Sequence, residues 1–316
     1  MLTKTPLNLD FEYANSTHLL LKDYSHLHLW LVGCGGTGSY VAESLARLAY
    51  VFKQRGKNVN VAFVDPDIVE EKNLGRQRFC QSELGLNKAA TLALRYNLTW
   101  GLEISAIPDY FDPKLVKSYW NDLVIITGSV DNSAARRSLG KTLESNRHSD
   151  IPRIWYLDAG NNFDSGQILL GSHNCGEGLI THLDQFERTG IMGALPSPIW
   201  QCPNLRESQP EELAEPHLSC AELSTINAQS LTINQAMASI IADYLFRLTL
   251  TSDLRRFATF LNLKSGSMRS EFISFSSLKR FARGGGGRGR VEKQGKRILT
   301  FTQNMLELNP TKFPCS

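Results

Sequence analysis

Four segments in the first half of this 316-residue chain carry residues suited to binding phosphate. The first is a glycine-rich turn at 33–38, which lies between an apolar stretch and a helix-compatible stretch. It is followed by Val-Asp-Pro-Asp at 64–67, by Asn-Leu-Gly-Arg-Gln at 73–77 with Lys88 beyond it, and by Asp131-Asn132. The order of these segments predicts a site for a nucleotide, its polyphosphate and a divalent metal.

The glycine turn has the G-x-G-x-x-G spacing at Gly33, Gly35 and Gly38. Glycines let a backbone approach phosphate closely, and the following helix offers free N–H groups and the positive end of its dipole. The alternative is a tight turn in which glycine serves only the packing of strand against helix.

Asp65 ends a predicted strand, where a carboxylate can accept hydrogen bonds from ribose hydroxyls. NAD-binding folds use an acid about 20 residues beyond the glycine motif in this way, whereas Asp65 lies 27 residues beyond Gly38. An NAD-dependent oxidoreductase is therefore an alternative. A dinucleotide fold, however, has no need of the Asn-x-x-Arg-Gln element or of Lys88. A triphosphate does, because Arg76 can form forked hydrogen bonds to phosphate, Lys88 supplies a point charge and Asp131 suits Mg²⁺.

The elements that must position these residues alternate between strand and helix. We predict strands at 29–32, 58–64, 102–107, 123–126, 154–157 and 167–170, and helices at 41–49, 87–96, 113–120, 133–145 and 225–248. Strands at 257–263 and 272–275 are predicted to form a hairpin. The pattern predicts an α/β fold that is Rossmann-like and doubly wound, with a mainly parallel sheet and a C-terminal antiparallel hairpin. Ligands bind at the carboxyl ends of the strands in such folds.

The chain divides into three parts by composition. Residues 1–27 form an N-terminal extension, and 28–277 form the α/β domain, in which 185–219 reads as a long crossover loop. Residues 278–316 form a basic, glycine-rich linker and tail. We interpret this last part as a flexible, charged linker, with an arm that contacts RNA or a partner as the alternative.

Composition narrows the class of protein. A net charge of +3 is too small to predict nucleic acid or a membrane as the main partner. The chain shows no signal peptide and no apolar run of the roughly 20 residues that span a membrane. Its six cysteines form no CxxC pair, which predicts free thiols and a cytoplasmic location.

The order of the motifs resembles the ThiF/MoeB superfamily, whose adenylation fold is shared with ubiquitin-activating enzymes. Within it, the chain resembles the ThiF proteins of the PRTRC system of bacterial plasmids, and the resemblance covers residues 28–275. The family's nucleotide-binding residues fall on Gly33, Gly35, Gly36, Gly38, Asp65, Asn73, Arg76, Gln77, Lys88 and Asn132, its metal ligand falls on Asp131, and Arg136 also keeps its place.

The resemblance implies an enzyme that binds ATP and Mg²⁺ and activates the C-terminal glycine carboxylate of a small ubiquitin-fold carrier protein as an acyl-adenylate. It also implies a homodimer. A carboxylate is already ionised at pH 7, so this chemistry requires no general base. Arg76 and Lys88 would stabilise the phosphate charge, and Asp131 would hold the metal.

Two features depart from the family pattern. No arginine precedes Arg47, so the upstream arginine that many relatives direct to the partner's phosphates has no counterpart. The two CxxC pairs with which many relatives hold zinc are also missing, and only His173-x-Cys175 and His217-x-x-Cys220 offer substitutes with unsuitable spacing. A non-catalytic, nucleotide-binding plasmid-maintenance protein is a further alternative.

Some relatives pass the activated carboxylate to a cysteine. Cys220 is the best candidate, since it precedes the long predicted helix, and a helix N-terminus lowers the pKa of a thiol. Cys202 is a weaker rival. Burial of either thiol in the core is the alternative.

Overall fold

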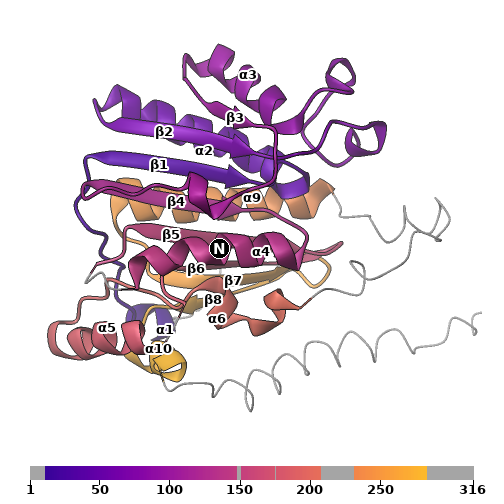
Figure 1. The fold of residues 1–316 in the computed structure, drawn as a ribbon. Helices are drawn as coiled ribbons and strands as arrows, with labels where there is room; N and C mark the ends of the chain where they lie inside the picture. The colour runs from indigo at the N-terminus through magenta and orange to yellow at the C-terminus, as the bar shows by residue number, and fades with distance from the viewer. Residues whose placement is uncertain (1–10, 148–150, 175, 208–230, 283–316) are drawn as a thin grey trace, which may run out of the picture.

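A computed structural model describes residues 11–147, 151–174, 176–207 and 231–282. Eight strands form one sheet in the order β3-β2-β1-β4-β5-β6-β7-β8 (Figure 1). Their bounds are β1 (His26–Val32), β2 (Asn58–Val64), β3 (Ser105–Ile107), β4 (Asp122–Gly128), β5 (Ile154–Asn161), β6 (Ser165–Gly171), β7 (Arg256–Asn262) and β8 (Ser267–Phe272). Strands β3, β2, β1, β4 and β5 pair in parallel, and β6, β7 and β8 continue the sheet as antiparallel strands.

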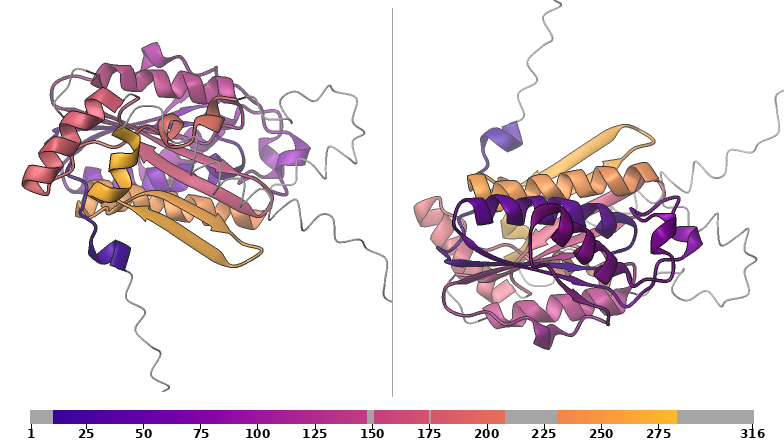
Figure 2. Two further views of the ribbon diagram at one scale, coloured as in Figure 1. Left: turned by 90° about the horizontal axis from the view of Figure 1, so that it is seen from below. Right: turned by 90° about the horizontal axis from the view of Figure 1, so that it is seen from above.

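Helices cover both faces of the sheet. Figure 2 shows α2, α3 and α9 on one face and α4 on the other. The helices are α1 (Phe11–Ala14), α2 (Gly36–Gln54), α3 (Lys88–Trp100), α4 (Ser133–Lys141), α5 (Gly176–Thr189), α6 (Pro198–Gln201), α9 (Leu231–Phe246) and α10 (Phe275–Ala282). Because both faces are covered, every residue of the central strand β4 is buried. The structure confirms the predicted Rossmann-like α/β fold.

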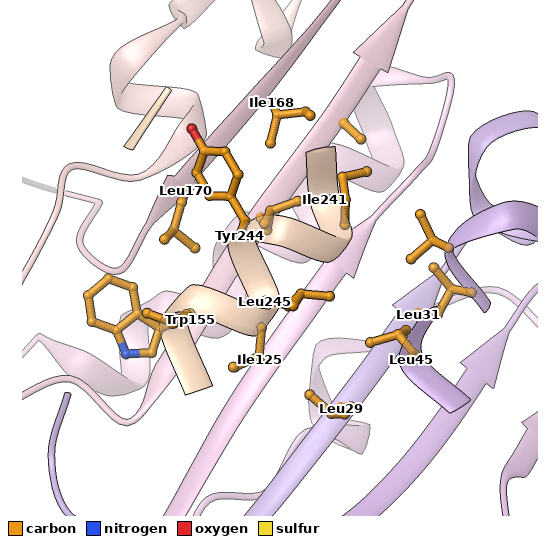
Figure 3. Close-up of a cluster of buried hydrophobic side chains, with 14 of the residues drawn as sticks. Leu29, Leu31, Leu45, Ile125, Trp155, Ile168, Leu170, Ile241, Tyr244 and Leu245 are labelled. Carbon is orange, nitrogen blue, oxygen red and sulfur yellow. The ribbon is translucent and has the colours of Figure 1, made fainter. Parts of the chain in front are cut away.

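Side chains that alternate along β4 divide between two cores. Leu123 and Ile125 belong to the larger core under α2 and α9, and Val124 and Ile126 to a smaller one with Leu139 of α4. Figure 3 shows how α9 fills the larger core, where its apolar side chains face those of β1, β4, β5 and β6. Helix α9 therefore packs against the parallel and the antiparallel halves of the sheet.

The region predicted as a loop at 185–219 is not a continuous loop where the structure describes it. Residues 185–189 complete α5, and a short helix α6 follows. The Ser197 side chain accepts a hydrogen bond from the Trp200 amide, and Pro198 occupies the first turn. Both features favour the start of a helix, and the abundance of polar residues concealed them.

The second strand of the hairpin lies earlier than predicted, at 267–272 instead of 272–275. It is the edge of the sheet and carries exposed polar residues, so its hydrophobic pattern is weak. The apolar residues after it begin α10, where the Ser274 hydroxyl accepts a hydrogen bond from the Ser277 amide. Helix α10 also takes in residues 278–282, which the sequence assigned to the linker.

Two helix predictions also need correction. Of residues 113–120, only Pro113–Leu115 form a turn of 3₁₀ helix. The long helix expected at 225–248 is seen as α9, followed by a π-helical turn at Arg247–Thr251, while 225–230 lie outside the described residues. Within the described chain, every helix is too short or too polar to cross a bilayer.

Candidate nucleotide-binding site

The predicted site residues lie around the carboxyl ends of β1 and β4. These neighbouring strands are parallel, but the chain leaves β1 through α2 on one face and leaves β4 through α4 on the other. The Gly33 amide donates to the Val64 carbonyl at 2.9 Å, and the Ser129 amide donates to the Val32 carbonyl at 2.8 Å. These bonds place the turns after β1, β2 and β4 side by side. In doubly wound folds, ligands bind at such a switch point.

The glycines of the turn have different structural roles. Gly33 has φ +88°, and a Cβ there would lie 2.5 Å from the Ser129 carbonyl oxygen. A Cβ on Gly38 would lie 1.9 Å from the Gly33 carbonyl oxygen, so the protein's own packing requires both glycines. A Cβ on Gly35 would meet only Gln77 Nε2, at 3.8 Å. Packing therefore explains Gly33 and Gly38, and Gly35 is the position that leaves room for a ligand.

Helix α2 begins at Gly36, and no side chain caps its N-terminus. The first amides of a helix have no partner within the helix, and the dipole makes this end positive. The glycines at 35, 36 and 38 carry no side chains that could shield these amides. The N-terminus of α2 is therefore suited to an anionic group.

Asp65 ties the glycine turn to the end of β2. Its Oδ2 accepts a hydrogen bond from the Cys34 amide at 2.5 Å, and its Oδ1 accepts one from the Asp67 amide at 2.9 Å. The carboxylate is buried, and burial raises the pKa of Asp65, while these hydrogen bonds and the charge of Lys88 act in the opposite direction. Each carboxylate oxygen has a second lone pair with which it can accept a ribose hydroxyl.

Lys88 is the first residue of α3, a helix capped by the Asn87 side chain, which accepts from the Ala90 amide. The Lys88 side chain is buried, and its Nζ donates to Asp67 Oδ2 at 2.9 Å. The Asp67 side chain is 64% exposed, so this ion pair faces solvent on its acidic side. An incoming phosphate can therefore replace or join Asp67 as the partner of Lys88. The sequence interpretation gave Asp67 no role, although it stands within the Val-Asp-Pro-Asp segment.

The loop at 73–77 holds its polar residues in two ways. Asn73 is buried, and its Oδ1 accepts from the Glu70 amide at 2.9 Å while its carbonyl accepts from the Gln77 amide at 2.8 Å. Asn73 therefore builds the turn that presents Arg76 and Gln77. Gln77 is buried as well, and among the described residues its Oε1 has no hydrogen-bond partner. Such an unpaired acceptor beside Gly35 is consistent with a site that receives a ligand.

Arg76 and Asp131 lie close enough to interact, although they come from different segments. Burial lowers the pKa of Arg76, and the charge of Asp131 opposes that change. Asp131 is exposed, and Asn132 donates to its Oδ1 at 3.3 Å while capping α4 through the Ala135 amide. Within the described ranges, no cluster of three or more His, Cys, Asp or Glu side chains could hold a metal. A magnesium ion that is bound with a polyphosphate needs only one or two protein carboxylates, which Asp131 fits.

Arg136 belongs to a separate, sealed group. Its Nη2 donates to the Val130 carbonyl at 2.8 Å, and its Nε lies 3.4 Å from Asp158 Oδ1. The Tyr156 hydroxyl donates to the same oxygen at 2.5 Å. All three side chains are buried, and burial raises the pKa of Asp158, while the Arg136 charge lowers it. This group holds α4 against β5.

Among the cysteine and histidine candidates, the structure describes Cys202 and His173. Cys175, His217 and Cys220 lie outside the described residues, so their roles stay predictions. Burial raises the pKa of the Cys202 thiol, and the nearby Asp158 raises it further, which disfavours the thiolate. His173 packs edge-to-face on His182 with ring centroids 5.2 Å apart, and burial and that neighbour lower the pKa of His173 to about 4.

Two surface hollows lie away from the predicted site. One of about 430 Å³ is lined by His26, His28, Tyr119, Trp120, Asn121 and Asp122, and one of about 230 Å³ by residues of β1, β2 and β3. The larger hollow lies at the amino ends of β1 and β4, opposite the glycine turn. Neither hollow includes a residue that the sequence predicted for the site.

The fold and the position of these residues define a doubly wound α/β protein with its candidate site at the switch point. Residues 10–150 match the model of the ThiF family. This segment contains every predicted site residue except Cys220, and the match supports the ThiF/MoeB resemblance there. The closeness to PRTRC-system proteins stays a prediction. No curated protein matches the chain.

Among solved structures, the chain is similar to E. coli MccB, solved with AMPCPP and MccA, at 15% identity and a TM-score of 0.48. That similarity covers 83% of this chain and 65% of MccB. PaaA is similar at 16% identity and a TM-score of 0.49, covering 78% of this chain and 64% of PaaA. The chain thus spans just under two thirds of the length of these proteins.

Proposed function

We propose that the chain is a ThiF-type, ATP-dependent adenylyltransferase. One observation carries this proposal: the uncapped N-terminus of α2, the Asp65 carboxylate, the Lys88 ammonium and the side chains of Arg76 and Asp131 lie around the switch point of one sheet. The match of residues 10–150 to the ThiF family supports it. Its substrate would be the C-terminal glycine carboxylate of a small ubiquitin-fold carrier protein.

ATP suits the groups that surround the turn. Asp65 would accept the ribose hydroxyls, and the α2 amides with Gly35 would accommodate phosphate at close range. Lys88 and Arg76 would bind the remaining phosphate charge. The unpaired Oε1 of Gln77 is the kind of buried acceptor that a donor on the ligand would satisfy.

The reaction would proceed by attack of the carrier's carboxylate oxygen on the α-phosphorus. The bond from that phosphorus to the bridging oxygen breaks, pyrophosphate leaves with the electron pair, and an acyl-adenylate remains. The attacking group is already an anion, so positioning and charge stabilisation by Arg76 and Lys88 are the protein's main contributions. Asp131 would hold Mg²⁺, which neutralises phosphate charge when bound.

Three further features belong to this proposal. The protein would act as a homodimer in the cytoplasm. If a transfer step follows, the Cys220 thiolate would attack the acyl carbonyl, forming a thioester and releasing AMP. The missing upstream arginine would be replaced by the charges of Arg76 and Lys88.

Nucleotide preference tests the binding step. We expect full-length protein to bind ATP with Mg²⁺ at least tenfold more tightly than NAD in a calorimetric titration. Arg76→Ala should weaken ATP binding by about 10- to 100-fold, since hydrogen bonds to charged groups contribute about 1.5–3 kcal/mol. Arg47→Ala is the matched control, because Arg47 is exposed, pairs with Glu43 of its own helix and lies over the Trp100 ring. Tighter binding of NAD than of ATP would favour an oxidoreductase.

Pyrophosphate exchange tests the chemistry. A glycine-tailed companion that co-purifies from the native host should support exchange of labelled pyrophosphate into ATP, and Asp131→Ala should abolish that exchange. If Cys220 forms the thioester with the companion, Cys220→Ala should abolish the reducible conjugate between the two proteins. A conjugate that still forms in Cys220→Ala would show that Cys220 does not carry the thioester. A companion that binds but supports no exchange would indicate a non-catalytic scaffold.

A further inference from the structure

Three polar side chains from distant parts of the chain meet at the first turn of α2. The Thr37 hydroxyl lies 3.0 Å from Asn161 Oδ1 and 3.2 Å from Asn234 Oδ1. The Asn161 amide also donates to Asn234 Oδ1, at 3.1 Å. Asn234 completes the set, because its Nδ2 donates to the main-chain carbonyl of Arg76 at 3.2 Å. We refer to Thr37, Asn161 and Asn234 as the asparagine tether.

Burial of these side chains makes the loss of any of these hydrogen bonds costly in free energy. Asn234 is 0% exposed and Thr37 is 5% exposed, so water does not replace a lost partner readily. A buried polar group that loses its partner is destabilised by about 1–3 kcal/mol. The side chain of Asn234 therefore has a strong preference for the one position in which its carbonyl and its amide are both satisfied.

The tether links the second half of the chain to the predicted phosphate site. Asn234 lies in the first turn of α9, which packs along α2. Through it, α9 holds the main chain of Arg76 at a fixed place relative to the glycine turn. Asn73 supports the same loop from the inside, and Asn234 is its support from the neighbouring helix.

We propose that Asn234 is a positioning residue for Arg76, a role that rests on the proposed function. In the contacts that the structure describes, Asn234 reaches Arg76 through the backbone carbonyl, so it acts on where the guanidinium is presented and not on its charge. A charged group contributes fully to phosphate binding only if the protein holds it in place before the ligand arrives. Loss of Asn234 should therefore weaken the phosphate part of ATP binding selectively.

The tether itself can be tested without nucleotide. In Asn234→Ala, hydrogen exchange at the amides of residues 73–78 should become at least fivefold faster than in the parent protein. Asn146→Ala is the matched control, because Asn146 is equally buried but bonds to the Ile154 and Ser172 carbonyls. That control should lower global stability without selective change at 73–78. Unchanged exchange there in Asn234→Ala, or the same change in both variants, would overturn the tether.

The positioning role is tested by comparing the binding of two ligands, ATP and adenosine. Asn234→Ala should weaken ATP binding about tenfold and adenosine binding less than twofold, because adenosine carries no phosphate. In the Arg76→Ala background, the same substitution should have no further effect on ATP. Equal losses for both ligands, or additive losses in the double variant, would refute the role. If the parent protein bound no ATP, the proposed function would fail, while the exchange experiment would still decide whether the tether holds the loop.

Discussion

Two groups of charged residues lie near the carboxyl ends of parallel strands, and they differ in exposure. The sealed group is Arg136, Asp158 and Tyr156 beside β5, and each of its side chains is less than a tenth exposed. The open group is Asp65, Asp67 and Lys88 after β2, in which the Asp67 side chain is 64% exposed.

Burial raises the pKa of an aspartate in both groups, at Asp65 and at Asp158. A perturbed pKa alone therefore does not distinguish a ligand site from a structural ion pair. The difference lies in the partner, since a cation whose counter-ion faces solvent can exchange that counter-ion for a ligand. The sealed pair has no counter-ion facing solvent that a ligand could replace, although Asp158 Oδ2 is, like Gln77 Oε1, a buried acceptor without a partner among the described residues.

The sealed group should give the largest effect on stability. Arg136→Met leaves the Asp158 carboxylate buried without its cation, and breaking such a pair destabilises a protein by about 3–5 kcal/mol. We expect a loss of about 4 kcal/mol at pH 7 in chemical denaturation. Adding Asp158→Asn should recover most of it, because the uncompensated charge is then gone. A loss below 1 kcal/mol for Arg136→Met alone would show that the pair is not sealed.

A second buried group, His173, should give a pH-dependent effect. Its pKa is about 4 in the folded protein and 6.5 in a free side chain, so the unfolded chain binds a proton more readily between these values. Stability that is fully present above pH 6.5 is therefore lost as the pH falls toward 4, by about 3 kcal/mol. Denaturation at pH 7 and pH 4 should show this loss in the parent protein and a much smaller one in His173→Gln. Parallel pH profiles for the two proteins would contradict the assignment.

A substitution in the open group should have the smallest effect on stability of the three and should weaken ATP binding instead. Lys88→Met keeps the buried stem and leaves the exposed Asp67 without its ion-pair partner. The buried Asp65 loses the charge of Lys88 but keeps its hydrogen bonds from the Cys34 and Asp67 amides, so we expect a stability loss of about 1 kcal/mol or less. ATP affinity should fall by about 30-fold, which is about 2 kcal/mol. Chemical denaturation measures the stability loss, and a calorimetric titration measures the loss of ATP affinity. A stability loss as large as that of Arg136→Met would remove the distinction between the two groups.

Local patterns were sufficient to predict the parallel half of the fold. Strands β1 and β2 are short, largely apolar runs that end directly before Gly33 and Asp65, and β4 ends three residues before Asp131. The sequence therefore places the glycine turn and both acids at or just beyond strand ends. The edge strand β8 was misplaced because its exposed side chains have no apolar pattern. Here, weak hydrophobicity is a consequence of position in the sheet.

Contacts between distant segments could not be predicted in this way. Asn234 bonds to Arg76 across 158 residues, and nothing in the surrounding apolar helix pattern marks it out. The Lys88–Asp67 pair spans 21 residues, and the Asn87 side chain also donates to the Asp67 carbonyl. Tertiary packing creates both contacts, so single-sequence patterns contain no sign of them.

The path of α9 has a consequence for experiments with fragments. Residues 10–150 contain the glycine turn and most of the predicted site residues, but β5, β6 and α9 all come later in the chain. A fragment that stopped at residue 150 would leave β4 as a bare sheet edge and expose the side of α2 that faces α9. We therefore expect that the segment that matches the family does not fold on its own, and that excising it would disrupt the turns after β1, β2 and β4.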